Sequence, residues 1–335
     1  PIEDEAPPAI DQVEAVPVDV ESIGRHLLGV VNPDQFDAGG APNDDFRISL
    51  AGAQEKDAYL WWNGAWHKPR GTTPTTDIFK LPLGLIGGHQ ADFTTSVENE
   101  WLCLKLLKAY GLPTADAAIQ TFGKQRVLVV ERFDRRVTID GRLLRLPQED
   151  FCQATGTSPL VKYENEGGPG LEKLFSVLQQ SANAAQDMRT LMASQVLFWL
   201  LRAPDGHAKN FSIQLLAGGT FQLTKMYDVM SAYPILGNGP NQWSARDVKL
   251  AMALMGKNRH YVMATVQRRH FNSTAQKVGY GGNAEDVIQE LIARTPAVID
   301  EVRAQLPEDF SPLVAEGVLD GLQAAVNALE AMPSA

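Results

Sequence analysis

Cysteine is scarce in this chain: Cys103 and Cys152 are the only two among 335 residues. Both lie in apolar stretches, and two such residues cannot form the disulfide framework that stabilises small secreted proteins. Because 44% of the residues are hydrophobic, a chain of this length can bury a core without disulfides or metal. The sequence predicts two core cysteines and a reducing compartment, which we take to be the cytoplasm.

Long hydrophobic runs are also missing, since none approaches the ~18 residues that a membrane-spanning helix needs. The first residues are acidic and include proline, unlike a basic and then apolar leader. Positive charge is in short supply, because 30 Lys and Arg stand against 40 Asp and Glu, a net charge of −10. Such a balance disfavours a general nucleic-acid binder, whose affinity comes from neutralising phosphates. We expect neither a membrane segment nor DNA contact by this chain alone.

The length predicts about two domains. Residues 1–45 contain several prolines and acidic side chains, and we assign them to a linker or a remnant of an N-terminal subdomain, in which Val20 to Val31 could form one short helix. Residues 46–135 are predicted to form a β-rich lobe crossed by one amphipathic helix that stops at Gly111. Its predicted strands are 46–51, 58–62, 77–80, 118–121 and 127–132.

Residues 136–335 are predicted to form a helical lobe. One hairpin interrupts it, because the strand-like runs 211–215 and 221–224 flank an Ala-Gly-Gly turn. The sequence thus predicts an α+β fold with a smaller β-rich lobe, a larger helical lobe and a ligand cleft between them. The predicted helices are 171–180, 189–201, 287–294 and 313–331.

Candidate catalytic and metal-binding residues lie in the segment 205–210, which follows a predicted helix and precedes a predicted strand. Asp205 and Asn210 form a D-x-x-x-x-N pattern, the spacing at which a phosphotransferase uses a carboxylate as base and an amide as metal ligand. Asp228 follows the hairpin and is a second candidate ligand for Mg²⁺, which prefers hard oxygen donors. Alone, this pattern fits a polar loop that caps a helix better than it fits a catalytic loop.

A lysine and a glutamate upstream occur in kinase-like order. Lys80 ends a predicted strand, and Glu100 lies 20 residues later on the amphipathic helix. A strand lysine held by a helical glutamate positions nucleotide phosphates. Glu98 competes with Glu100 for this role, and the sequence leaves the choice open.

Two motifs of protein kinases are absent. Asp228 is followed by Val229 and Met230 rather than by Phe-Gly, and no G-x-G-x-x-G is present. The turn that would cover the phosphates must rely on small residues whose backbone N–H groups can approach an anion. That candidate turn consists of Ser49, Leu50, Ala51, Gly52 and Ala53.

Seven separated segments give the chain a family resemblance: it is similar to the HipA-type serine/threonine kinases of bacterial toxin–antitoxin modules. The similarity extends from about residue 46 to the last helices. The segments are FRISLAGAQEK (46–56), KLP (80–82), VERFDRR (130–136), RLPQEDFCQ (145–153), VKYENEGGPG (161–170), DGHAKNFS (205–212) and YDVMSA (227–232).

The resemblance implies a bilobal kinase fold that binds ATP and Mg²⁺. It implies that Asp205 is the catalytic base, that Asn210 and Asp228 bind Mg²⁺, and that Lys80 binds the ATP phosphates. His207 occupies a position where other kinases carry a phosphate-facing lysine, so a catalytic and a structural role both stay open.

Further nucleotide contacts are implied for Glu131, Arg132 and Phe133 at the adenine-binding hinge, and for Lys209. The family autophosphorylates a serine of its phosphate-covering loop, which inactivates the kinase. The matching residue is Ser49, which otherwise is an ordinary strand serine.

One family feature has no counterpart in the sequence, because nothing before Phe46 could supply the usual β-rich N-terminal subdomain. We expect that this subdomain was removed or is a separate polypeptide that acts as a partner. Other implied partners are a helix-turn-helix antitoxin of HipB type, with DNA bound only through it, and an aminoacyl-tRNA synthetase as substrate.

Three functions follow from these patterns. The first is an active kinase that arrests growth, a toxin linked to persistence, for which the resemblance implies glutamyl-tRNA synthetase as the target. The second is a kinase-shaped co-repressor that acts mainly by binding the antitoxin on operator DNA. The third is an inactive core that lacks a required subdomain. Loss of Asp205 separates the first two, because binding survives it and phosphoryl transfer does not.

Overall fold

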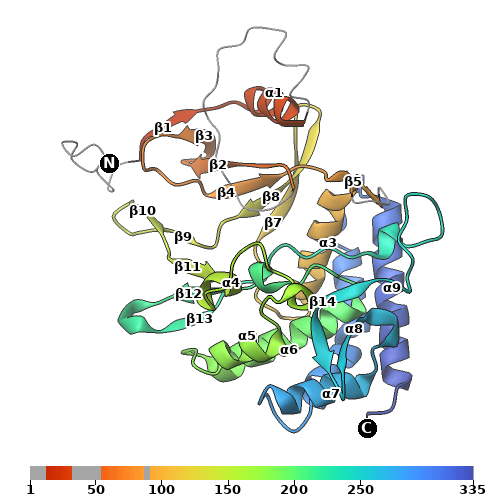
Figure 1. Ribbon diagram of the computed structural model, residues 1–335. Coiled ribbons are helices and arrows are strands. Elements are labelled where there is room, and N and C mark those ends of the chain that lie inside the picture. The colour runs from red at the N-terminus through yellow and green to blue at the C-terminus, as the bar shows by residue number, and fades with distance from the viewer. Residues whose placement is uncertain (1–12, 32–53, 87–90, 335) are drawn as a thin grey trace. The chain divides into compact units, whose positions relative to one another are not determined.

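The computed structural model describes residues 13–31, 54–86 and 91–334. The chain forms two compact units: unit 1 contains Pro1–Leu83 and Ala115–Leu146, and unit 2 contains Gly84–Thr114 and Pro147–Ala335. Unit 1 is rich in strands and unit 2 in helices (Figure 1), which agrees with the predicted mixture of a β-rich and a helical part. Residues 84–114 group with unit 2, whereas the sequence-based lobes divide the chain once, near residue 135.

Unit 1 contains a six-stranded sheet in the order β1-β3-β2-β4-β8-β7, with every neighbouring pair antiparallel. A hairpin of β9 and β10 follows it. The predicted strand 46–51 and the turn at 49–53 lie outside the described residues. The elements of unit 1 are β1 (Ala15–Pro17), α1 (Val20–Val31), β2 (Lys56–Trp62), β3 (Ala65–Pro69), β4 (Asp77–Lys80), β7 (Ala117–Phe122), β8 (Gln125–Glu131), β9 (Arg135–Val137) and β10 (Leu143–Arg145).

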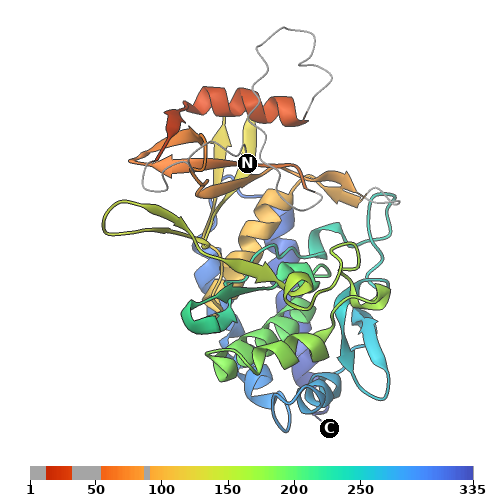
Figure 2. The same cartoon turned by 60° about the vertical axis from the view of Figure 1, so that its left-hand side comes forward.

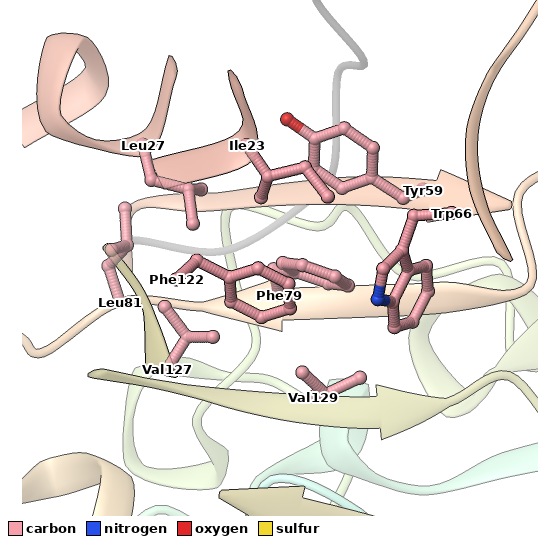
Figure 3. Close-up of a cluster of buried hydrophobic side chains, with 9 residues drawn as sticks. All are labelled: Ile23, Leu27, Tyr59, Trp66, Phe79, Leu81, Phe122, Val127 and Val129. Atoms are coloured by element: carbon pink, nitrogen blue, oxygen red, sulfur yellow. The ribbon is translucent and has the colours of Figure 1, made fainter. Parts of the chain in front are cut away.

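Helix α1 covers one face of this sheet (Figure 3). The side chain of Asp19 begins the helix by accepting the backbone N–H of Ser22 at 2.6 Å, which satisfies one of the free donors of a helix start. Gly24 lets the helix approach β7, because a Cβ there would lie 2.7 Å from the carbonyl oxygen of Phe122. Residues 15–31, which sequence reasoning assigned to a lead-in, therefore contribute a strand and a helix to unit 1.

Phe79 lies in the middle of the core beneath α1 (Figure 3). Its ring centroid is 4.9 Å from the centroids of the Tyr59, Trp66 and Phe122 rings. Because successive side chains of a strand point to opposite faces, burial of Phe79 under α1 directs Lys80 to the other face of the sheet. The packing of unit 1 thereby fixes the direction of the predicted phosphate-binding lysine.

Unit 2 consists mainly of helices, with three small sheets. The short sheets are β5–β6, β11–β12–β13 and β14–β15. The elements are β5 (Gly84–Ile86), β6 (Ala91–Phe93), α3 (Ser96–Ala109), β11 (Gln148–Asp150), α4 (Phe151–Ala154), α5 (Leu171–Leu178), α6 (Ala184–Leu200), β12 (Ser212–Leu215), β13 (Phe221–Leu223), β14 (Lys249–Met255), β15 (Arg259–Val262), α7 (Arg268–Lys277), α8 (Glu285–Arg303) and α9 (Pro312–Ala331).

Helices α3, α6, α8 and α9 pack against one another in unit 2 (Figure 2). The guanidinium of Arg294 on α8 donates hydrogen bonds of 2.8 Å to the carbonyls of Ala109 and Tyr110, which satisfies free acceptors at the end of α3. The hydroxyl groups of Tyr110 and Thr295 lie 2.6 Å apart and add a second link between these helices. The end of α3 is therefore held firmly against α8.

Both cysteines are free and buried, as the sequence predicts. Burial raises the pKa of the Cys103 thiol, so this side chain stays a neutral core residue. Among the helices formed by residues 13–31, 54–86 and 91–334, none has the length and apolar character to cross a membrane.

We expect Phe79→Ala to lower the free energy of unfolding of unit 1 by about 3–5 kcal/mol, because it leaves a cavity among three aromatic rings. Chemical denaturation followed by tryptophan fluorescence measures this change. Val137→Ala on the exposed side of β9 is the control, for which we expect a change within about 0.5 kcal/mol. Equal effects of the two substitutions would contradict the central place of Phe79.

Candidate functional site

Residues 205–210 form a loop between α6 and β12 in unit 2, as the sequence predicts. The backbone leaves α6 through Arg202, which has a φ of 50°, and ends in a short 3₁₀ turn, Ala208–Asn210. Gly206 lies against the ring of Phe198 on α6, where a Cβ would come within 2.3 Å of a ring carbon. Only glycine fits there while Phe198 keeps its position.

Asp205 carries the carboxylate expected to act as base. Its side chain is 41% exposed, and Oδ1 accepts a hydrogen bond of 2.6 Å from the hydroxyl of Tyr163. Its backbone carbonyl accepts the N–H of His207 at 2.8 Å. A half-exposed carboxylate on a fixed backbone can receive a proton from an external hydroxyl.

Asn210 is 6% exposed and forms a hydrogen bond with Asp205. Its Nδ2 donates a hydrogen bond of 2.7 Å to the carbonyl oxygen of Asp205. With the amide nitrogen used in this way, the amide oxygen is the atom that can face a cation. The loop thus joins the predicted base and the predicted metal ligand directly.

Asp228 follows β13 and has a backbone φ of 59°, a left-handed conformation that is uncommon for a non-glycine residue and that asparagine and aspartate tolerate best. The segment after it is fixed by Asn99 on α3: Nδ2 of Asn99 donates to the carbonyl of Ser231 at 2.7 Å, and Oδ1 accepts the N–H of Ser231 at 2.8 Å. The hydroxyl of Ser231 donates to the carbonyl of Leu201 at 2.6 Å. The end of α6 and the Asp228 segment therefore hold each other in place.

Asn210 and Asp228 offer the donors that suit Mg²⁺, an amide oxygen and a carboxylate. No three side chains of His, Cys, Asp or Glu form a metal-binding group within residues 13–31, 54–86 and 91–334. An ion held by these two residues would complete its shell with phosphate oxygens and water, as Mg²⁺ commonly does.

His207 is buried and packs edge-on against Tyr163, with ring centroids 5.0 Å apart. Its Nε2 lies 3.7 Å from Oδ1 of Asp205, too far for a hydrogen bond. Burial lowers the pKa of His207 below its ordinary value of 6.5, although the Asp205 carboxylate opposes this change. The imidazole is therefore neutral near pH 7, which favours the structural role over a cationic contact to phosphate.

Lys209, a predicted nucleotide contact, forms an ion pair of 2.6 Å with Oδ2 of Asp150. Its backbone carbonyl accepts the hydroxyl of Tyr227 at 3.0 Å, and that hydroxyl lies 2.6 Å from the hydroxyl of Ser212. These contacts fix both the side chain and the backbone of Lys209 within the loop. A role toward nucleotide stays a prediction.

The remaining predicted site residues belong to unit 1. Lys80 is buried with 7% of its surface exposed, and Glu131 pairs in register with Asp77 across β8 and β4. Burial and the nearby Glu131 raise the pKa of Asp77 to about 6, while a hydrogen bond from Thr76 opposes this. The guanidinium of Arg132 binds both carboxylate oxygens of Asp134, at 3.0 and 2.9 Å.

Three predictions stay open at this site. Phe133 lies in unit 1 just after Glu131 and Arg132, and adenine binding by these three residues is a prediction. Lys80 belongs to unit 1, whereas Glu98 and Glu100 are buried on α3 in unit 2, so their pairing is a prediction as well. The loop residues Ser49, Leu50, Ala51, Gly52 and Ala53 lie outside the described part of the chain.

The HipA-like C-terminal domain model matches residues 48–299. The chain belongs to this family. The resemblance inferred from the seven sequence segments is thus confirmed, and the match spans both units.

Two curated relatives support the assignment. The chain is 36% identical over 235 residues to Y4mE of Sinorhizobium fredii, which is named as a kinase, covering 69% of this chain and 53% of that protein. It is 31% identical over 198 residues to the serine/threonine-protein kinase toxin HipA of Shewanella oneidensis, covering 55% and 43%. The chain therefore spans about half the length of these relatives.

A solved structure shares the fold. The HipA chain of Shewanella oneidensis MR-1, in a complex with HipB and operator DNA, superposes with a TM-score of 0.74 at 24% identity. The match covers 98% of this chain and 74% of that chain. The similarity shows a common HipA fold.

Sequence reasoning missed two residues of this site. Tyr163 lies in one of the seven segments, VKYENEGGPG, but no pattern in the sequence joins it to Asp205, 42 residues later. Asn99 lies between Glu98 and Glu100, and sequence reasoning considered only these two glutamates, as partners of Lys80. A polar amide in the middle of an otherwise buried helical stretch was the available signal, because buried polar groups need partners.

We expect Asn99→Ala to destabilise unit 2 by about 1–3 kcal/mol, because it leaves the N–H and the carbonyl of Ser231 buried without their partners. Differential scanning calorimetry measures the loss. Asn327→Ala is the matched control on the exposed side of α9 and should leave the melting temperature nearly unchanged. If Asn99→Ala were as stable as this control, the anchoring role of Asn99 would be wrong.

Proposed function

We propose that the chain is an ATP- and Mg²⁺-dependent serine/threonine protein kinase and the toxin of a toxin–antitoxin system. The observation that carries the proposal is the hydrogen bond from Nδ2 of Asn210 to the backbone carbonyl of Asp205. It links the proposed metal ligand to the proposed base, at the spacing that a phosphotransferase loop uses. Membership of the HipA-like family and the kinase names of both relatives support it.

In this proposal Asp205 accepts the proton of an acceptor hydroxyl. The hydroxyl oxygen bonds to the γ-phosphorus of ATP while the bond to the leaving ADP breaks. Asn210 and Asp228 hold Mg²⁺, which when bound neutralises charge on the phosphates. Lys80 binds those phosphates, and the segment Glu131–Phe133 holds the adenine.

We further propose a translation component as substrate, an aminoacyl-tRNA synthetase and specifically the glutamyl one, and the cytoplasm as the place of action. The partner is a helix-turn-helix antitoxin of HipB type, with DNA bound through it. The complex of a HipA of the same fold with HipB and operator DNA supports this partner. It also supports the second candidate, a co-repressor that needs antitoxin binding and not catalysis.

Asp205→Asn and Asp228→Asn test the first proposal, and asparagine at 228 suits the left-handed backbone of that residue. We expect transfer from labelled ATP to glutamyl-tRNA synthetase to fall by about 10²–10⁴-fold in either variant. Asp228→Asn should also weaken MgATP binding, whereas Asp205→Asn should not. Labelling is followed by gel and by mass spectrometry of the substrate.

Asp320→Asn on the exposed side of α9 is the matched control and should keep the full rate. Wild-type rates in Asp205→Asn and Asp228→Asn would refute the roles proposed for these two carboxylates as base and metal ligand. If such variants still bound the antitoxin and repressed the operator, the co-repressor would be favoured.

We also propose that Ser49 is autophosphorylated and that its phosphate inactivates the enzyme. A phosphoserine carries about −1.5 to −2 charges near neutral pH, and the anionic ATP phosphates would bind close to it. Ser49→Ala should therefore keep its initial rate during incubation with ATP, while the wild-type rate declines. Ser176→Ala on α5 is the control and should decline like the wild type. An equal decline in Ser49→Ala would refute this regulation.

A further inference from the structure

Tyr163 has a direct contact with the predicted base that the proposed mechanism does not use. Its hydroxyl donates a hydrogen bond of 2.6 Å to Oδ1 of Asp205. Burial and the neighbouring carboxylate raise the pKa of the Tyr163 phenol, so the group keeps its proton at physiological pH. Hydrogen bonds to an ionised acceptor are shorter and about twice as strong as neutral ones.

The segment that carries Tyr163 is held at several points within unit 2. The carbonyl of Tyr163 accepts the N–H groups of Glu166 at 3.1 Å and of Gly168 at 2.9 Å. The carboxylate of Glu164 accepts the N–H of Ala253 on β14 at 2.5 Å and also pairs with Arg259.

Close packing completes this support. A Cβ at Gly168 would lie 2.4 Å from the carbonyl oxygen of Val161, so the backbone folds tightly next to the tyrosine. The turn therefore presents the phenol from a fixed backbone.

The ring of Tyr163 is also fixed. His207 packs edge-on against one part of it, with an angle of 75° between the ring planes. The ammonium of Lys162 lies 5.1 Å from the ring centroid, within the range of a cation–π contact. Neutral His207 thus supports the tyrosine, which accounts for a buried imidazole two residues after the base.

We propose that Tyr163 is a positioning residue for Asp205 in phosphoryl transfer. This inference rests on the proposed kinase function. The phenol occupies Oδ1 and fixes the rotation of the carboxylate, so that the other oxygen faces the acceptor hydroxyl. A base held in the productive orientation removes part of the entropic barrier of the reaction.

The geometry favours positioning over obstruction of the base. An ionised carboxylate has about four acceptor sites on two oxygens, and Tyr163 uses one of them. No other side chain of the described residues donates a hydrogen bond to this carboxylate, which is 41% exposed. Room for an acceptor hydroxyl therefore remains while the tyrosine stays in place.

Tyr163→Phe tests the inference, since it removes the hydroxyl and keeps the ring against His207. We expect kcat to fall about tenfold or more, with the KM for ATP and the melting temperature nearly unchanged. Tyr280→Phe is the matched control, because the Tyr280 hydroxyl also donates to a carboxylate, that of Asp286 at 2.9 Å, away from the loop. This control should keep the wild-type kcat.

A rescue experiment separates positioning from a packing role. Replacing Tyr163 by 4-aminophenylalanine restores a donor in nearly the same place and should recover much of kcat, which a role in packing would not require. A Tyr163→Phe enzyme with wild-type or higher kcat would overturn the inference, and so would the absence of rescue.

A readout independent of activity distinguishes this inference from the kinase proposal. At neutral pH the ¹³C carboxyl resonance of Asp205, assigned by its loss in Asp205→Asn, should move in Tyr163→Phe and stay in place in Tyr280→Phe. An unmoved resonance would overturn the inference even in an active enzyme. Absence of transfer by the wild type, together with a moved resonance, would instead reject the kinase proposal and leave the hydrogen bond established.

Discussion

The hydrogen bond from the Asn210 carboxamide to the Asp205 carbonyl sets the geometry on which the site depends. It closes a loop of six residues on itself and links the amide of Asn210 to the backbone of Asp205, the proposed base. Buried polar groups must find partners, and here the partner of the proposed metal ligand Asn210 is the backbone of the proposed base Asp205. Tyr163 contacts this closed loop at Asp205, the ion pair with Asp150 holds its Lys209, and Asn99 fixes the neighbouring segment that follows Asp228.

Much of the local structure could be predicted from the sequence, because it depends on neighbouring residues. The bounds of α1 and β4 agree with the predicted ranges 20–31 and 77–80. The hairpin of β12 and β13 forms around its Ala-Gly-Gly turn as expected. Helix α8, however, continues to Arg303, beyond the predicted end at residue 294. Pro296 lies inside this helix and does not end it.

Long-range pairings could not be predicted in this way. Three sets of contacts join segments 59 to 132 residues apart: those of Glu164 with β14 and β15, the ion pair of Lys209 with Asp150, and the two hydrogen bonds between Asn99 and Ser231. Composition and periodicity carry no information about such partners. The D-x-x-x-x-N spacing predicted Asp205 and Asn210 as site residues, since both lie in one loop, but it could not predict the tyrosine that bonds to Asp205.

The contact between Gly206 and Phe198 links the evolution of two positions. The aromatic ring fills the volume that any side chain at 206 would occupy, so position 206 cannot carry a side chain while Phe198 keeps its place. A larger residue at 206 becomes acceptable only together with a smaller residue at 198, which leaves room for the new side chain. Across related sequences a side chain at 206 should occur only with a smaller residue at 198, and a library that randomises the loop needs Phe198 among its variable positions.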